Sequence, residues 1–144
     1  MIPRHLLSDK TPLETEDAAA AIIVVGSSGY LLQLRDDIPG IFYSGHWCCF
    51  GGAIHTDETA RDAVGRELAE ELEFKVAHCH DFIRLDFDLA DVNGKKIYRA
   101  YYEVHVTADE ASQFVLHEGA DAKVLRAAEI FDGRPVAPYD AFAL

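Results

Sequence analysis

Positive charge is scarce in this sequence. Its 144 residues include 13 lysines and arginines against 25 aspartates and glutamates, giving a formal net charge of −12 at pH 7. A surface that binds nucleic acid needs a basic footprint, so we expect no nucleic-acid partner. The imbalance does not exclude a polyphosphate substrate, because a divalent cation can mask the local negative field.

Cysteines and long apolar runs are also few. The chain has three cysteines, two of them adjacent as Cys48 and Cys49, and an odd number does not make a disulfide framework. It has no stretch of 18 apolar residues and no basic N-terminal segment followed by an apolar signal core, so we expect no membrane partner. Reduced thiols favour a cytoplasmic location, and the length favours one domain over residues 1–144.

Candidate zinc ligands lack a second pair. His78 and His80 would share one face of a strand, which suits a metal. No other pair follows at zinc-finger spacing. Ordinary strand packing or exposure is therefore the favoured interpretation of both histidines.

The sequence does contain one dense stretch of glycines and charged residues. It starts at the pair Gly51-Gly52. Five residues separate Gly52 from Glu58, seven more lead to Arg66, and the run RELAEELEF begins there. The glycine pair predicts a tight turn that lets the backbone approach an ion or phosphate closely.

The residues after Glu58 predict a helix. Thr59–Leu72 contains no proline and one glycine, and Thr56 or Asp57 is expected to cap its N-terminus. Apolar side chains recur at every fourth position, which predicts a stripe that packs on a core. The stripe consists of Ala60, Val64, Leu68 and Leu72.

Three glutamates lie beside that stripe. At about 100° per residue, Glu67, Glu70 and Glu71 fall within one arc of roughly 100°. Carboxylates this close repel one another unless a cation lies among them. Hard divalent ions such as Mg²⁺ take carboxylate and phosphate oxygens as ligands, which indicates a metal site. The alternative is a solvated acidic helix face.

This spacing of Gly52, Glu58 and the run from Arg66 to Phe74 resembles the signature of the Nudix hydrolase family. The strict motif covers 23 residues. The preceding segment, with Trp47 shortly before the glycine pair, is similar to the family as well. One position departs from the pattern, since Glu73 stands where the family usually has the glycine of a left-handed helix cap.

The resemblance implies an α/β fold, the α/β/α sandwich with a mixed β-sheet, and the order of expected strands and helices favours the same class. It implies hydrolysis of a nucleoside diphosphate linked to a further group X, with Mg²⁺ or Mn²⁺ as cofactor. The implied metal ligands are the Gly52 carbonyl, Glu67, Glu70 and Glu71. The implied catalytic residues are Glu70, Glu67, Arg66, Glu58 and Glu118.

Some of these roles stay open. Arg66 is the expected orienter, paired with Glu58 or with a metal-binding carboxylate through a charge-assisted hydrogen bond. Relatives take the general base either from the motif or from a downstream loop. Glu118 is the candidate in such a loop, with a plain surface glutamate as the alternative. Arg35 is a candidate for contact with a substrate phosphate, and plain surface is again the alternative.

The remaining elements are predicted from apolar runs and turn residues. Asn93-Gly94 predicts a hairpin turn, and Thr107–Gln113 a polar loop or short turn. The predicted strands are Ala18–Val25, Tyr30–Leu34, Phe74–His80, Asp81–Leu89, Lys96–Val106 and Lys123–Leu125. A last helical segment is predicted to start at Arg126–Phe131, and Pro138–Phe142 is expected to extend the C-terminus against the core.

The identity of X is narrowed by what is missing. Relatives that act on ADP-ribose commonly carry a proline near Asp86–Leu89, and diadenosine polyphosphate hydrolases a tyrosine near Ala90–Gly94; this chain has neither. Nucleoside triphosphates, oxidised ones included, and nucleotide sugars remain as the small-molecule substrates. A homodimer stays open as the oligomeric state.

Two rival functions share the resemblance. Isopentenyl-diphosphate isomerases place a catalytic cysteine just before a degenerate motif, which draws attention to Cys48 and Cys49. Their motif loses the consecutive glutamates that this chain retains. A nucleotide-sensing module without turnover is the other rival, and such a module would be expected to lose motif carboxylates. Neither loss is seen here.

Overall fold

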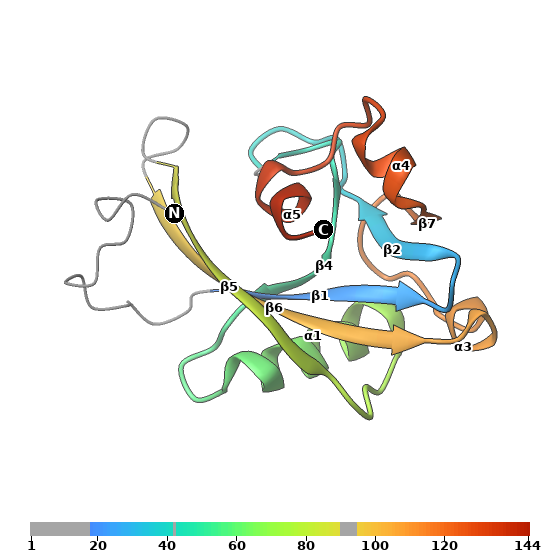
Figure 1. Ribbon diagram of the computed structural model, residues 1–144. Coiled ribbons are helices and arrows are strands. Elements are labelled where there is room, and N and C mark those ends of the chain that lie inside the picture. The colour runs from blue at the N-terminus through green and yellow to red at the C-terminus, as the bar shows by residue number, and fades with distance from the viewer. Residues whose placement is uncertain (1–17, 42, 90–94) are drawn as a thin grey trace, which may run out of the picture.

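The computed structural model describes residues 18–41, 43–89 and 95–144, with elements labelled as in Figure 1. The strands in these ranges are β1 (Ala18–Val25), β2 (Gly29–Leu34), β3 (Trp47–Cys48), β4 (Phe50–Ala53), β5 (His80–Leu89), β6 (Lys95–Val106) and β7 (Asp121–Leu125). The helices are α1 (Ala60–Leu72), α3 (Ala108–Ser112), α4 (Ala127–Phe131) and α5 (Pro138–Ala143). None of the helices in the described ranges is long and apolar enough to cross a membrane.

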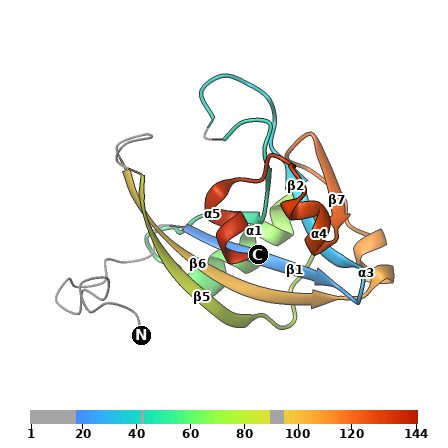
Figure 2. The same cartoon turned by 45° about the horizontal axis from the view of Figure 1, so that its top comes forward.

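The described strands join in one mixed sheet. Its order is β3-β2-β1-β6-β5, with β4 also paired to β1 and β7 to β2. β1 and β6 run parallel along their whole contact, from the pair Ala18 and Arg99 to the pair Val25 and Val106. The pairings of β1 with β2 and of β5 with β6 are antiparallel, and Figure 2 shows β5 and β6 side by side. The predicted mixed sheet is confirmed.

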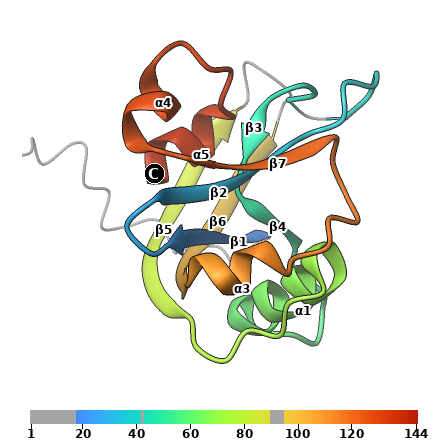
Figure 3. The ribbon, with the colours of Figure 1, turned by 90° about the vertical axis from the view of Figure 1, so that its right-hand side faces the viewer.

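Helices cover both faces of this sheet. Figure 3 shows α1 on one side and α4 and α5 on the other. Successive β1 residues alternate between the two cores, as the period of a strand requires. The core on the α1 side includes Ala19, Ala21, Ile23, Val64 and Leu68. The core on the α4 and α5 side includes Ala20, Ile22, Ile130 and Ala143. The α/β/α arrangement expected from the sequence is therefore confirmed.

The start of α1 differs from the prediction. Thr59 is the N-cap, so Thr56 and Asp57 were wrong candidates. The Thr59 hydroxyl accepts the Asp62 N–H at 3.1 Å, while the Asp62 carboxylate accepts the Thr59 N–H at 3.4 Å. This capping box satisfies two backbone donors, which neither earlier residue can do at that spacing.

Two further predictions fail for local reasons. Phe74–His80 is not a strand, since only His80 belongs to β5. The chain leaves α1 through a left-handed residue, Glu73, and crosses to the sheet edge without a partner strand. Thr107–Gln113 contains a short helix, α3, because Thr107 and Glu110 form a second capping box.

The predicted turn at Asn93-Gly94 lies outside the described residues. The other predicted strands and helices are confirmed to within two residues.

Candidate functional site

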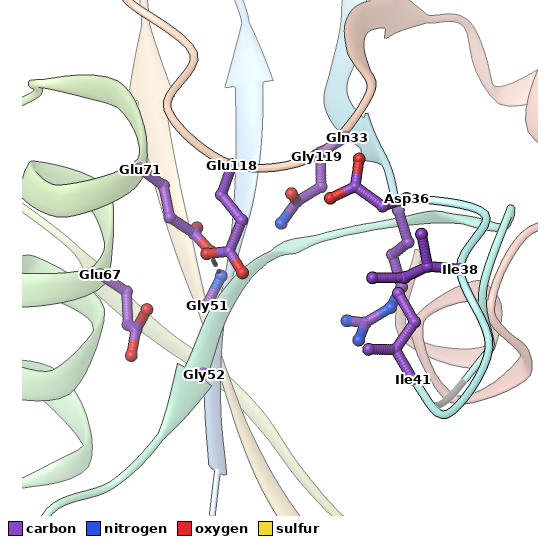
Figure 4. A pocket seen from close by; sticks show the side chains of 11 residues that line it. Gln33, Asp36, Ile38, Ile41, Gly51, Gly52, Glu67, Glu71, Glu118 and Gly119 are labelled. Carbon is purple, nitrogen blue, oxygen red and sulfur yellow. Dashed lines mark hydrogen bonds between the residues drawn. The ribbon is translucent and has the colours of Figure 1, made fainter.

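A cleft of about 420 Å³ lies between α1, the glycine strand β4 and the end of β2. Figure 4 shows its two walls, with glutamate side chains on one side and the segment after β2 on the other. Its volume falls in the range of small-molecule sites. The lining residues are Gln33, Arg35, Asp36, Ile38, Ile41, Gly51, Gly52, Glu67, Glu71, Glu118 and Gly119.

The glycine pair forms the floor of the cleft. A Cβ atom on Gly51 would meet the Ala19 carbonyl oxygen at 2.2 Å, so β4 packs against β1 more tightly than any side chain allows. A Cβ atom on Gly52 would meet the Glu67 carboxylate, with Oε1 at 2.5 Å and Cδ at 2.7 Å. Absence of a side chain at Gly52 therefore leaves the Glu67 carboxylate directly against the backbone.

Glu71 is the most buried carboxylate of the cleft, with 4% of its surface exposed. Its Oε2 accepts the Gly51 N–H at 3.2 Å. Burial, followed by the charges of Glu118 and Glu67, raises the pKa of Glu71 to about 8. The carboxyl thus lies where negative charge is disfavoured unless a cation compensates it.

Glu118 reaches the cleft from a distant loop. Its side chain points toward that of Glu71 (Figure 4). The loop is attached on both sides of Glu118: the His117 N–H donates to the Glu71 carbonyl at 2.9 Å, and the Ala120 N–H donates to the Leu34 carbonyl at 2.8 Å. These backbone bonds place Glu118 in the cleft, as expected of a site residue.

Arg66 joins three glutamates at the edge of the cleft. Its Nε and Nη2 donate to both oxygens of Glu58 at 3.0 Å and 2.7 Å, a bidentate geometry with high specificity. Its Nη1 donates to Glu67 Oε1 at 2.7 Å and to Glu70 Oε2 at 3.3 Å. Its Nη2 also donates to the Ala53 carbonyl at 3.0 Å. The guanidinium thereby ties α1 to β4 and holds the Glu67 carboxylate in one orientation.

Glu58→Gln tests this arrangement through the pH dependence of stability. The hydrogen bonds from Arg66, followed by that from the His55 N–H, lower the pKa of Glu58 from 4.5 to about 2. A lowered carboxyl pKa stabilises the fold above the unfolded value and loses that effect as pH falls through the folded value. We expect the wild type to be more stable than the variant at about pH 7, with the difference shrinking below about pH 4.5.

Urea unfolding of both proteins at about pH 7, 4 and 3 measures this difference. A difference that stays constant down to about pH 3 would contradict the assigned pairing.

The structure brings together most of the site residues predicted from the sequence. Glu67, Glu71, Glu118 and Gly52 line one cleft. Arg66 and Glu58 lie at its edge, joined as predicted. Glu70 lies outside the lining, with a side chain 60% exposed and paired to Arg66.

The opposite wall holds residues that sequence reasoning missed, apart from Arg35. Arg35 Nε is buried and has no hydrogen-bond partner in the described part of the chain. Gln33 is 5% exposed and lines the cleft, as do Asp36, Ile38 and Ile41. The alternation of β2, which puts Gln33 and Arg35 on one face, was the signal available for Gln33. This wall offers a cation, an amide and apolar contacts to a ligand.

The donor set of the cleft fits a hard divalent cation. Three carboxylates and a glycine backbone approach one another, and Arg35 is the one basic residue among the lining residues. No three His, Cys, Asp or Glu side chains in the described ranges already converge at metal-ligand distances. Binding an ion here therefore requires carboxylates to turn toward it, which rotation about their side-chain bonds permits.

The two cysteines of the rival isomerase function lie away from the cleft. Cys48 and Cys49 are each 2% exposed, and neither is a lining residue. Burial, followed by the charge of Asp140, raises the pKa of Cys48 to about 12 and that of Cys49 well above its usual value. Both thiols therefore stay protonated, which disfavours acid or nucleophile roles in this cleft. The Cys49 N–H instead donates to the buried Asp140 at 2.8 Å.

Comparisons with known proteins agree with the motif and the fold. A family model described as NUDIX domain matches residues 15–140. A Mycobacterium tuberculosis protein, whose name describes an 8-oxo-dGTP diphosphatase, is 42% identical over 67 residues, which is 46% of this chain and 46% of that relative. The match therefore spans less than half the length of that curated relative.

Solved structures with a similar fold cover most of the chain. A MutT protein from Methanosarcina mazei Go1 aligns with a TM-score of 0.71 and 21% identity, over 88% of this chain and 89% of that one. The E. coli ORF135 protein aligns with a TM-score of 0.69 and 26% identity, over 92% of this chain and 90% of that one. The fold is thus shared along nearly the whole described sheet and its covering helices.

Proposed function

Because this chain belongs to the NUDIX domain family, we propose that it is a metal-dependent pyrophosphohydrolase of nucleoside diphosphates linked to a further group. Nucleoside triphosphates, oxidised ones included, and nucleotide sugars are the substrate classes. One observation carries the proposal: Glu67 and Glu71 from α1, Glu118 from a distant loop and the Gly52 backbone line a single cleft. α1 and the loop have no packing reason to direct carboxylates at one another there, because such charges repel.

Enzymes of this family generally use divalent metals, and the oxygen donors of the cleft suit Mg²⁺ or Mn²⁺. We assign Glu67, Glu71 and the Gly52 carbonyl as ligands, with Glu70 turning in from the edge of the cleft. A bound ion would neutralise the pyrophosphate, lower the pKa of an attacking water and stabilise the leaving phosphate. Cation binding would also offset the burial, and the repulsion from Glu118 and Glu67, that raise the pKa of Glu71.

The protein's own residues then orient the reactants. Arg66 fixes the Glu67 carboxylate by a 2.7 Å hydrogen bond, with Glu58 holding the guanidinium. In the reaction a water oxygen bonds to phosphorus, the bridging P–O bond breaks, and a cleft carboxylate accepts the water proton. Glu67 and Glu118 are the candidates for that base, since both line the cleft. These residues would position the reactants and stabilise charge in the transition state, and these two effects account for most of the catalysis of phosphoryl transfer.

The opposite wall suits the rest of a nucleotide. Arg35 presents a guanidinium whose Nε has no partner among the described residues, and a substrate phosphate would provide one. Ile38 and Ile41 offer apolar contact to a nucleoside, with the Gln33 amide and the Asp36 carboxylate as polar groups. The name of the Mycobacterium tuberculosis relative supports nucleoside triphosphates as the first class to test.

A substrate panel tests the proposal. Purified protein with Mg²⁺ is incubated with nucleoside triphosphates, 8-oxo-dGTP, nucleotide sugars, dinucleotides and isopentenyl diphosphate, and the products are separated by chromatography and identified. We expect a nucleoside monophosphate among the products, and loss of turnover when the metal is chelated. Nucleotide binding without turnover would identify a sensing module, and formation of dimethylallyl diphosphate from its isomer would identify the isomerase. Either result would overturn the proposal.

A further inference from the structure

Glu73, the residue that ends α1, adopts a backbone conformation that is unfavourable for a glutamate. Glu73 has φ 54° and ψ 31°, and is one of two non-glycine residues with positive φ in the described ranges. The left-handed region brings Cβ close to the following carbonyl oxygen, so glycine is the usual residue there. The cap itself is complete, since the Glu73 N–H donates to the Ala69 carbonyl and the Phe74 N–H to the Leu68 carbonyl. A glutamate adds nothing to this backbone geometry.

The Glu73 side chain does make a contact that glycine cannot make. Its Oε1 lies 2.6 Å from Nε2 of His117. The backbone around His117 also attaches to the end of α1: the Val115 N–H donates to the Leu72 carbonyl at 3.1 Å and the His117 N–H to the Glu71 carbonyl at 2.9 Å. The Phe114 ring lies 4.7 Å from the Phe74 ring, centroid to centroid. Residues 114–117 are thus docked on the C-terminal end of α1, and the Glu73–His117 pair is the exposed end of that contact.

The direction of the Glu118 side chain, which follows His117 in the sequence, is explained by this docking. The N–H groups of Val115 and His117, two residues apart, both face the helix end, as in an extended strand. Neighbouring side chains of an extended segment point to opposite sides. The His117 ring points to Glu73, and Glu118 accordingly points into the cleft toward Glu71 (Figure 4).

Glu118 needs such a restraint because its neighbours repel it. Glu71 and Glu67 line the same cleft, and like charges at this range favour opening of the loop. We propose that Glu73 and His117 are positioning residues that hold the loop closed on α1 and thereby aim Glu118 into the cleft. The role rests on the function proposed above, because a fixed Glu118 matters only if it serves the cleft.

Glu73→Gly separates this role from a merely structural one. Glycine suits the left-handed cap, so the variant is expected to melt no lower than the wild type. Loss of the pair is expected to speed amide hydrogen exchange in peptides covering residues 113–119 about fivefold, and to lower kcat about fivefold with KM within about twofold. Mn²⁺ affinity, measured by electron paramagnetic resonance without nucleotide, is expected to fall by a similar factor, because the negative charge of Glu118 would then lie farther from the carboxylates proposed to bind the ion. Glu73→Gln, which keeps a hydrogen-bond acceptor, should recover most of each loss.

His117→Ala approaches the same pair from the other side, and the double variant closes a thermodynamic cycle. We expect the double variant to lose no more than either single one, because both remove one interaction. Additive losses, or unchanged exchange in Glu73→Gly, would overturn the proposal. Faster exchange with unchanged Mn²⁺ affinity and kcat would overturn it as well. If the wild type hydrolyses no nucleotide, the proposed function fails, and the exchange and Mn²⁺ arms still decide whether the pair aims Glu118.

Discussion

Glu71→Gln is expected to lower metal-dependent turnover about 100-fold to 1,000-fold and, in the same protein, to raise the melting temperature measured without metal. The turnover loss follows from removing a carboxylate that we propose as a metal ligand, at the scale seen when one electrostatic contributor is deleted. Glutamine keeps the shape of the side chain and an acceptor for the Gly51 N–H, which now lies 3.2 Å from Oε2. The fold is therefore retained while the charge is lost.

The stability gain comes from the burial of an uncompensated carboxylate. The pKa of Glu71 is raised from 4.5 to about 8, so ionisation destabilises the metal-free fold increasingly as pH rises from 4.5 to 8. Below about pH 4.5 the carboxyl is protonated in both the folded and the unfolded state, so the variant should be no more stable than the wild type. Near pH 7.5 we expect the variant's free energy of unfolding to be about 2 kcal/mol higher than that of the wild type, because water in the cleft screens part of the full effect. A gain of this size corresponds to a rise in melting temperature of roughly 5 °C.

A matched control removes one negative charge elsewhere. Glu103 lies on β6, and its carboxylate pairs with His105 at 3.1 Å on the exposed surface. Glu103→Gln should change neither turnover nor metal-free stability by much, since Glu103 does not line the cleft and its exposed pair with His105 joins two residues of the same strand. Retained turnover in Glu71→Gln, or a lower melting temperature without metal, would show that this carboxylate is not a metal ligand held in an unfavourable position.

Gly52→Ala is expected to lower turnover about 100-fold with little loss of stability. The new Cβ would lie 2.5 Å from Glu67 Oε1, so the carboxylate must move away from the cleft floor and from Arg66. Misplacement of a catalytic group by about 1 Å can cost this much. The backbone of Gly52 is outside the positive-φ region, so alanine introduces no strain of its own.

Gly65→Ala is the control for this variant. Gly65 lies inside α1, and a Cβ atom there would meet nothing within 4 Å. Alanine in a helix interior should stabilise the protein by about 0.5 to 1 kcal/mol and leave turnover unchanged. Steady-state kinetics and thermal melting of the two variants measure the contrast. Equal turnover in Gly52→Ala and the wild type would show that the Glu67 position against the backbone is unimportant.

The part of the site that the sequence predicted is the part encoded locally. Gly52, Glu67 and Glu71 lie close together in sequence, and one helix after one turn brings them to the same cleft. Their positions follow from helix periodicity once the helix is assigned. Strands β1 and β2 were predictable for a similar reason, since apolar runs bounded by turn residues need little tertiary information.

The remaining features depend on contacts between distant segments. Glu118 enters the cleft because backbone bonds to Glu71 and Leu34 hold its loop, and no local pattern encodes those partners. Phe74–His80 has the composition of a strand but finds no partner on leaving the helix end. At the cap of α1, a tertiary contact to His117 accompanies a glutamate where local propensity favours glycine.

Manganese anomalous diffraction tests the central claim most directly. Crystals grown with Mn²⁺ and a non-hydrolysable nucleoside triphosphate analogue locate the ion independently of turnover. The account predicts anomalous peaks within about 2.3 Å of Glu67 and Glu71 oxygens and of the Gly52 carbonyl, with phosphate oxygens completing the coordination. Peaks confined to other sites, with these side chains turned to solvent and the triphosphate bound away from α1, would contradict it.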